Sequence, residues 1–183
     1  PRGVISSLED EMDQGRSIVR DLIPLAGHIY PVGRLDKQSE GLMLMTNDGK
    51  LAHRLTHPRF AHEKEYEVTL EGRISDQNLE QWRHGVQLDD RLTAPADIHV
   101  LRKSKDATLL RITLREGRKR QIRRIAAAFG HPVRSLVRTR IGSLTLGNLK
   151  PGEWRYLNDE EIQMLQKAVN FPAEKKKPHK NKH

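Results

Sequence analysis

Residues 65–70 alternate between polar and apolar side chains. Tyr66, Val68 and Leu70 therefore share one face of an extended segment, as in a strand that is buried on one side. Four further segments have the composition of strands: 95–101, 109–114, 133–138 and 141–146. Helical patterns separate these strands irregularly and not as regular βα repeats. The sequence predicts an α+β fold with a mixed, largely antiparallel sheet flanked by helices.

The clearest helix is predicted over 118–130, where apolar residues recur at helical spacing and Gly130 provides a stop. Three other helices are predicted: over 50–57, over 75–84, and from Asn158 onward. Asn158 and Glu161 have the spacing of a capping box, which satisfies free backbone amides at a helix start. These helices supply the layers that cover the predicted sheet.

The chain of 183 residues carries 33 Lys and Arg against 24 Asp and Glu, a formal net charge of +9, which suits a partner that is a polyanion. No run approaches the roughly 20 apolar residues of a membrane helix, and cysteine is absent. We expect one globular domain over 1–171, a disordered basic tail over 172–183, and a cytoplasmic monomer without a membrane partner.

Six of the ten residues between Arg115 and Arg124 are cationic. On a helical wheel with Ile122 inward, Arg120 and Arg124 point outward, where they can neutralise phosphates. Arg123 falls at the boundary of the apolar stripe, from which it can reach a buried carboxylate. A charge run of this kind is more often a solvated helix face, but the net charge favours an RNA surface.

The segment Gly33-Arg34-Leu35-Asp36 places Arg34 and Asp36 on one side of an extended chain. Nearby cations favour the ionised form of a carboxylate, which a nucleophile requires. By spacing alone, a structural salt bridge is the commoner interpretation. Tyr66 is similarly ambiguous, because strands contain tyrosine for packing as well as for ligand contact.

His53 and His57 are four residues apart on a predicted helix, a spacing that could direct two imidazoles at one metal ion. A stable metal site usually has at least three protein ligands, and no His-Glu-x-x-His pattern is present. The sequence also has neither a Walker-type phosphate loop nor a dinucleotide fingerprint. We therefore predict neither a metal nor a nucleotide cofactor.

Three motifs give the chain a family resemblance. They are GRLDKQSEGLMLMTNDGKLAHRLTHP at 33–58, KEYEV at 64–68, and EGRKRQIRRIAAAFGHPVRSLVRTRIG at 116–142. In this order they resemble the RsuA/RluB-type family of bacterial ribosomal pseudouridine synthases, over nearly all of 1–158. The resemblance implies the pseudouridine synthase catalytic fold and ribosomal RNA as partner. It also implies a small N-terminal RNA-binding domain that is absent from this chain.

The resemblance also implies roles for individual residues. Asp36 matches the essential aspartate, Tyr66 the tyrosine that stacks on the flipped base, and Arg123 the basic residue that pairs with the aspartate. Arg34 matches the arginine that fills the gap left by the extruded uridine, and Leu136 matches an aliphatic residue of the pocket. Further RNA contacts are expected from other basic residues within these motifs: Lys64, Arg118, Lys119, Arg120 and Arg124.

The implied reaction breaks the bond between ribose C1′ and N1 of uracil, rotates the base and rejoins it through C5. No atom is gained or lost, so the reaction needs a placed carboxylate and a closed pocket but no cofactor. The target base must first leave the RNA stack. Asp36 could attack C1′, attack the base ring or remove the C2′ proton.

The segment Arg34-Leu35-Asp36 with Ser39-Glu40-Gly41 favours the large-subunit branch of the family, and hence 23S rRNA as substrate. Two alternatives stay open at this point. The same reaction could occur on 16S rRNA, or the chain could be a catalytically silent protein for rRNA binding or assembly.

Overall fold

A computed structural model describes residues 1–7, 15, 17–57, 62–89 and 91–170. The predicted basic tail at 172–183 lies outside the described residues. The strands are β1 (Tyr30–Pro31), β2 (Glu40–Gly41), β3 (Met45–Thr46), β4 (Lys64–Glu71), β5 (Gln87–Leu88), β6 (Arg91–Leu92), β7 (Asp97–Lys103), β8 (Ala107–Leu114), β9 (Val133–Ile141) and β10 (Leu144–Thr145). The helices are the 3₁₀ helix η1 (Val19–Leu22), α1 (Gly49–Thr56), α2 (Asp76–His84), α3 (Gln121–Ala128) and α4 (Asp159–Asn170).

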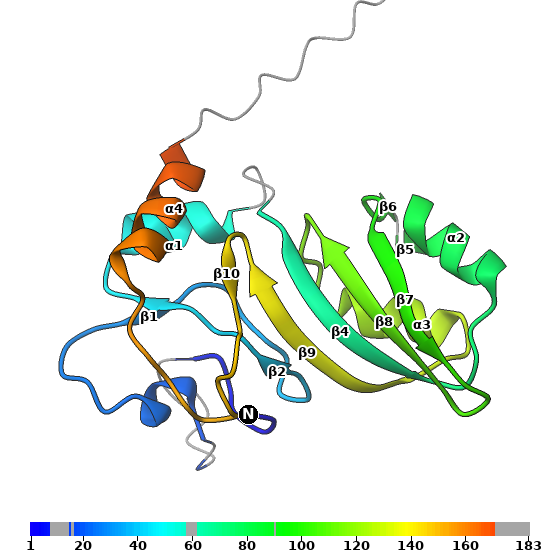
Figure 1. The fold of residues 1–183 in the computed structure, drawn as a ribbon, viewed down its shortest axis with the longest axis horizontal. Coiled ribbons are helices and arrows are strands. Elements are labelled where there is room, and N and C mark those ends of the chain that lie inside the picture. Colours follow the sequence, from blue (N-terminus) through cyan, green and yellow to red (C-terminus); the bar gives the residue numbers. More distant parts are fainter. Residues whose placement is uncertain (8–14, 16, 58–61, 90, 171–183) are drawn as a thin grey trace, which may run out of the picture.

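The main sheet has the strand order β10-β9-β4-β8-β7, and all neighbours on this path are antiparallel. Strand β2 joins it in parallel, beside β9 (Figure 1). Two smaller pairs, β1 with β3 and β5 with β6, lie apart from this sheet. The predicted mixed, largely antiparallel sheet is therefore confirmed.

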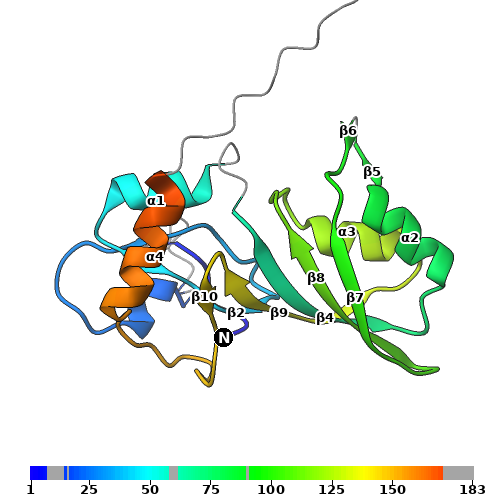
Figure 2. The same ribbon diagram turned by 45° about the horizontal axis from the view of Figure 1, so that its top comes forward.

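The core forms two clusters of buried side chains. Helices α2 and α3 pack on the main sheet, where Trp82 and Ile125 meet Val68 and Leu110. The second cluster joins α1 and α4 to the segments around β3 and β10. Figures 1 and 2 show these helix pairs at opposite ends of the molecule, with strands β9 and β4 between them.

Local capping bonds explain where three of the helices begin. The Asp48 carboxylate accepts hydrogen bonds from two amides of α1, and the Ser75 hydroxyl accepts one at the start of α2. At α4, Asn158 Oδ1 accepts from the amide of Glu161, whose carboxylate accepts in turn from the amide of Asn158. The predicted capping box is confirmed.

Helix α3 is shorter at both ends than the predicted span of 118–130. Arg120 adopts a left-handed conformation with a φ of 53°, so the basic residues before Gln121 form a turn and not a helical face. At the other end, Gly130 has a φ of 78°, the left-handed conformation that ends many helices. The orientation of Arg120 is thus set by this turn.

Strand β9 continues to Ile141, and only Leu144 and Thr145 form β10. The predicted boundary between strands at 133–138 and 141–146 was therefore wrong, because the chain reverses at Gly142, which has a φ of 56°. A bulge lies within β9: Glu65 pairs with Arg140 and Tyr66 with Arg138, which leaves Thr139 as the extra residue.

Gly41 allows β2 to approach β9 closely. It has a φ of 110°, and a Cβ atom at this position would lie 2.4 Å from the carbonyl oxygen of Arg138. The amide of Leu42 donates to the same oxygen at 2.7 Å. The parallel pairing thus requires glycine for both its conformation and its lack of a side chain.

We expect Gly41→Ala to lower the free energy of unfolding by roughly 2 to 4 kcal/mol, since it combines backbone strain with a backbone clash. Urea denaturation measures this difference. Gly49→Ala is the matched control, because nothing lies within 4 Å of its Cβ position and its φ is not left-handed. Equal stabilities for the two variants would contradict the close approach.

Candidate active site

Asp36 lies in the connection between β1 and β2, in a tight turn in which the amide of Ser39 donates to the carbonyl of Asp36 at 2.8 Å. The N-terminal segment holds this turn from one side. The Ser6 hydroxyl accepts from the amide of Leu35 at 3.0 Å, and the amide of Gly3 donates to the carbonyl of Lys37 at 2.8 Å. The half-buried Asp36 therefore sits on a fixed stretch of backbone.

Arg123 reaches the Asp36 turn from α3. Its Nη2 donates to the carbonyl of Gln38 at 2.8 Å and to Ser39 Oγ at 3.3 Å. Burial lowers the pKa of Arg123, Arg120 and Arg2 lower it further, and the Asp36 charge opposes them. In the part of the chain that the structure describes, no ion pair within 4.0 Å joins Arg123 to Asp36, and the buried Arg123 Nε has no hydrogen-bond partner. Arg123 thus fixes the turn through its Nη2, while its buried Nε makes no hydrogen bond within the described residues.

Tyr66 lies on β4, half-buried, and packs against the main core cluster. Burial raises the pKa of the Tyr66 hydroxyl, Arg138 opposes this effect, and the negative charge of Asp36 adds to it. Tyr66 and Asp36 are therefore close enough to influence each other. Strand β4 and the β1–β2 connection bring together two residues that are 30 positions apart in the sequence.

The other residues predicted at the pocket have different environments. Lys64 is half-buried and donates from Nζ to the carbonyl of His62 at 3.1 Å. Burial, and then the charge of Arg138, lower the pKa of Lys64. Leu136 is buried in the main core cluster opposite Val68. Arg34 is exposed beside the turn.

Two of the predicted RNA-contacting arginines hold the β5–β6 hairpin. Arg118 donates to the carbonyls of Arg91, at 2.9 Å, and Leu92. Arg124 forms an ion pair with Asp89 at 2.6 Å, which lowers the pKa of that carboxyl. These two guanidinium groups are already engaged within the protein.

The other two residues of this segment that were predicted to contact RNA, Lys119 and Arg120, face the Asp36 turn or solvent. Lys119 is exposed, and the exposed Arg120 donates from Nη2 to Gln38 Oε1 at 3.1 Å. The turn created by the left-handed Arg120 therefore directs Arg120 toward the site and not along a helix face.

The sequence analysis did not single out Arg138, which is only 1% exposed. Its Nε donates to the carbonyl of Leu42 at 2.8 Å and its Nη1 to the carbonyl of Arg34 at 3.3 Å. One signal was available: Arg138 stands two residues after Leu136, so strand alternation places a charged side chain on the buried face.

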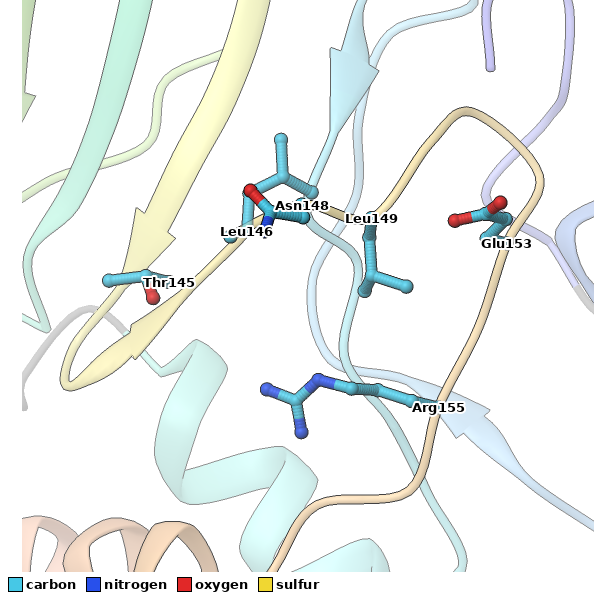
Figure 3. Close-up of a pocket in the computed structure, with 7 residues that line it drawn as sticks. Thr145, Leu146, Asn148, Leu149, Glu153 and Arg155 are labelled. Carbon is cyan, nitrogen blue, oxygen red and sulfur yellow. The ribbon is translucent and has the colours of Figure 1, made fainter.

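An open pocket of about 370 Å³ is lined by the end of β10 and the connection that follows it. Thr145, Leu149 and Arg155 are among its lining residues, and Figure 3 shows their side chains around it. Arg155 is paired with Glu161 at 2.6 Å. None of the predicted site residues lines this pocket, so it is separate from the site around Asp36.

His53 and His57 lie on and just after α1, with ring centroids 5.2 Å apart. Among the described residues, no group of three or more His, Cys, Asp or Glu side chains could hold a metal ion. Within the same residues, no helix has the length and apolar character to cross a membrane.

Comparison with known proteins agrees with this arrangement. A crystal structure of a pseudouridylate synthase superposes with a TM-score of 0.81 at 33% identity, covering 90% of this chain and 70% of that one. This likeness defines the fold as that of a pseudouridine synthase catalytic domain. The profile of the RNA pseudouridylate synthase family matches residues 1–128. The chain belongs to this family.

Three curated relatives illustrate the similarity. An uncharacterized RNA pseudouridine synthase of Aquifex aeolicus is 42% identical over 86% of this chain and 64% of its own length. The ribosomal large subunit pseudouridine synthase B of Bacillus subtilis is 39% identical over 90% and 68%. The ribosomal large subunit pseudouridine synthase E of Vibrio parahaemolyticus is 40% identical over 90% and 71%. The chain thus spans about two thirds of these relatives.

Proposed function

We propose that this chain converts a specific uridine to pseudouridine in ribosomal RNA, and that its substrate is 23S rRNA. The observation that carries the proposal is the convergence of Asp36, Tyr66 and Arg123 from three separate segments of a pseudouridine synthase fold. Two of the relatives described above act, by name, on the large ribosomal subunit. This is the support for 23S over 16S rRNA.

In this proposal each of the three residues has a separate role. The Asp36 carboxylate acts on the flipped nucleoside as the bond from C1′ to N1 breaks. The ring of Tyr66 stacks on the detached uracil and keeps it in place while it rotates. Arg123 fixes the Asp36 turn through Gln38 and Ser39.

The RNA face in this proposal centres on the Asp36 turn. Arg34, Lys37, Lys119 and Arg120 are exposed around it and can neutralise phosphates. Extrusion of the uridine costs a few kcal/mol, which such contacts offset. Arg118 and Arg124 contribute by holding the β5–β6 hairpin at the edge of this face. We further propose that the protein works as a monomer in the cytoplasm, where ribosomal RNA is available.

The test is incubation of the protein with separate 23S and 16S transcripts, followed by mapping of pseudouridine through carbodiimide-stopped reverse transcription. We expect product at one position in 23S rRNA with the unmodified chain. Asp36→Asn should abolish it and leave RNA affinity within about twofold, because the shape is kept and only the nucleophile is lost.

The control is Asp97→Asn, which changes an exposed carboxylate on β7. Product from Asp36→Asn would remove Asp36 from its proposed role. Product only in 16S rRNA would overturn the substrate assignment. Tight binding without any product from the unmodified chain would favour a catalytically silent rRNA-binding protein.

Arg123→Ala should lower turnover by about 100-fold while RNA affinity changes only a few fold, because a misplaced reacting group costs rate more than binding. Single-turnover rates and filter binding separate the two quantities. Arg102→Ala, an exposed arginine on the edge strand β7, should leave turnover within a few fold. Equal losses of rate and affinity for Arg123→Ala would contradict a role at the Asp36 turn.

Arg120→Ala should weaken RNA binding and reduce the slope of log affinity against log salt by about one ion. The measurement is a binding titration at several salt concentrations. Arg102→Ala is the control, because Arg102 is exposed on the edge strand β7. An unchanged slope would assign the Arg120 side chain to its contact with Gln38 alone.

A further inference from the structure

We propose that Arg138 is a positioning residue for the isomerisation, which holds the Asp36 segment in register and directs the Tyr66 hydroxyl into the active site. This inference rests on the proposed function. It concerns a side chain that is buried behind the site and does not touch the RNA.

Arg138 binds the Asp36 segment on both sides of the carboxylate. Nη1 donates to the carbonyl of Arg34, two residues before Asp36, and Nε donates to the carbonyl of Leu42, six residues after it. Nη2 contacts Met43 Sδ at 3.7 Å. The backbone adds a third connection, because the amide of Leu42 donates to the carbonyl of Arg138. One residue of β9 therefore fixes both ends of the chain that carries Asp36.

Arg138 also lies beside Tyr66. The two residues are register partners in β9 and β4, and cross-strand partners place their Cβ atoms about 5 Å apart on one face of a sheet. The bulge at Thr139 lies next to this pair, and Thr139 Oγ1 closes it by donating to Glu65 Oε1 at 3.1 Å. Such bulges redirect side chains locally.

The direction of the interaction with Tyr66 follows from the chemistry of the two groups. Register pairing places the two side chains on one face, and a guanidinium can only donate hydrogen bonds, so we infer that the Tyr66 oxygen accepts from Arg138. The phenolic hydrogen is then free to donate toward the site that contains Asp36. The same contact acts on the pKa values, because Arg138 opposes the rise for Tyr66 and Tyr66 opposes the fall for Arg138.

The burial of this charge is costly for the fold alone. Its acceptors in the described part of the chain are carbonyls, a thioether and a phenol, and none of them is a carboxylate. A buried cation without an anionic partner loses several kcal/mol of hydration. Leu136, two residues earlier on the same strand, shows that an apolar side chain fills such a position well. We therefore assign the buried cation a role in positioning the active site and not in stabilising the fold.

The test is a double-mutant cycle between Arg138→Gln and Tyr66→Phe, read as kcat and KM for pseudouridine formation. We expect Arg138→Gln to lower kcat by about 100-fold with KM within about threefold. In the Tyr66→Phe background Arg138→Gln should lower kcat only about tenfold, because the contribution of Arg138 that acts through the Tyr66 hydroxyl is already lost. This tenfold coupling corresponds to about 1.4 kcal/mol.

Thr108→Val is the matched control for loss of a buried polar side chain, since Thr108 is fully buried and bonds Gly72 and Ile74 away from the site. Its effect on kcat should be the same in both backgrounds. Urea denaturation confirms that each variant is folded. If Arg138→Gln does not fold, Arg138→Lys, which keeps the charge but loses the planar fork, takes its place in the cycle.

If Arg138→Gln lowers kcat by the same factor, within about twofold, in the unmodified and the Tyr66→Phe backgrounds, the role through Tyr66 is overturned. An unchanged kcat in the folded Arg138 variant would overturn the whole proposal. The unmodified chain is assayed in parallel on the same RNA. Absence of product from that chain would count against the proposed function, and is thereby distinguished from a failure of the Arg138 proposal.

Discussion

The parallel pairing of β2 with β9 is the contact on which the site depends. Gly41 lies so close to Arg138 that a side chain has no room, and the Arg138 guanidinium holds carbonyls on both sides of this point. The connection between β1 and β2, which carries Asp36, would otherwise sample many conformations, because each ordered residue costs about 1 to 2 kcal/mol of conformational entropy. The pairing places Asp36 against the central strands β9 and β4, where Tyr66 lies.

Electrostatics around the Asp36 turn complete this arrangement. Burial lowers the pKa of Arg123 beside this turn, the charges of Arg120 and Arg2 lower it further, and the charge of Asp36 opposes them. The region is therefore rich in positive charge at the place where an RNA phosphate backbone would approach the carboxylate. The same positive charge is partly neutralised elsewhere, since Asp89 and Glu116 engage Arg124 and Arg118 at the hairpin. Pairing with a carboxylate thus separates the cations that stabilise the hairpin from those that lie at the Asp36 turn.

Much of the fold could be predicted because its signals are local. Alternation over 65–70 marked β4, and the Asn158–Glu161 capping box marked the start of α4, since neighbouring residues alone decide such features. The start of α3 could not be predicted, because nothing in the sequence signals the left-handed conformation of Arg120. The candidate site residues came from motifs, whereas Arg138 was missed because its hydrogen-bond partners lie 96 and 104 positions away.

The sequence by itself determined which groups are candidates for the chemistry: the carboxylate at Asp36, the aromatic ring at Tyr66, and the cations of the 115–124 segment. It also determined the main strands and helices, because periodicity and capping act over a few residues. Only the tertiary structure decided which cations serve the site, how α3 meets the Asp36 turn, and what lies behind Tyr66. These outcomes depend on contacts between distant segments, and a chain fixes such contacts only when its strands pair and its core packs.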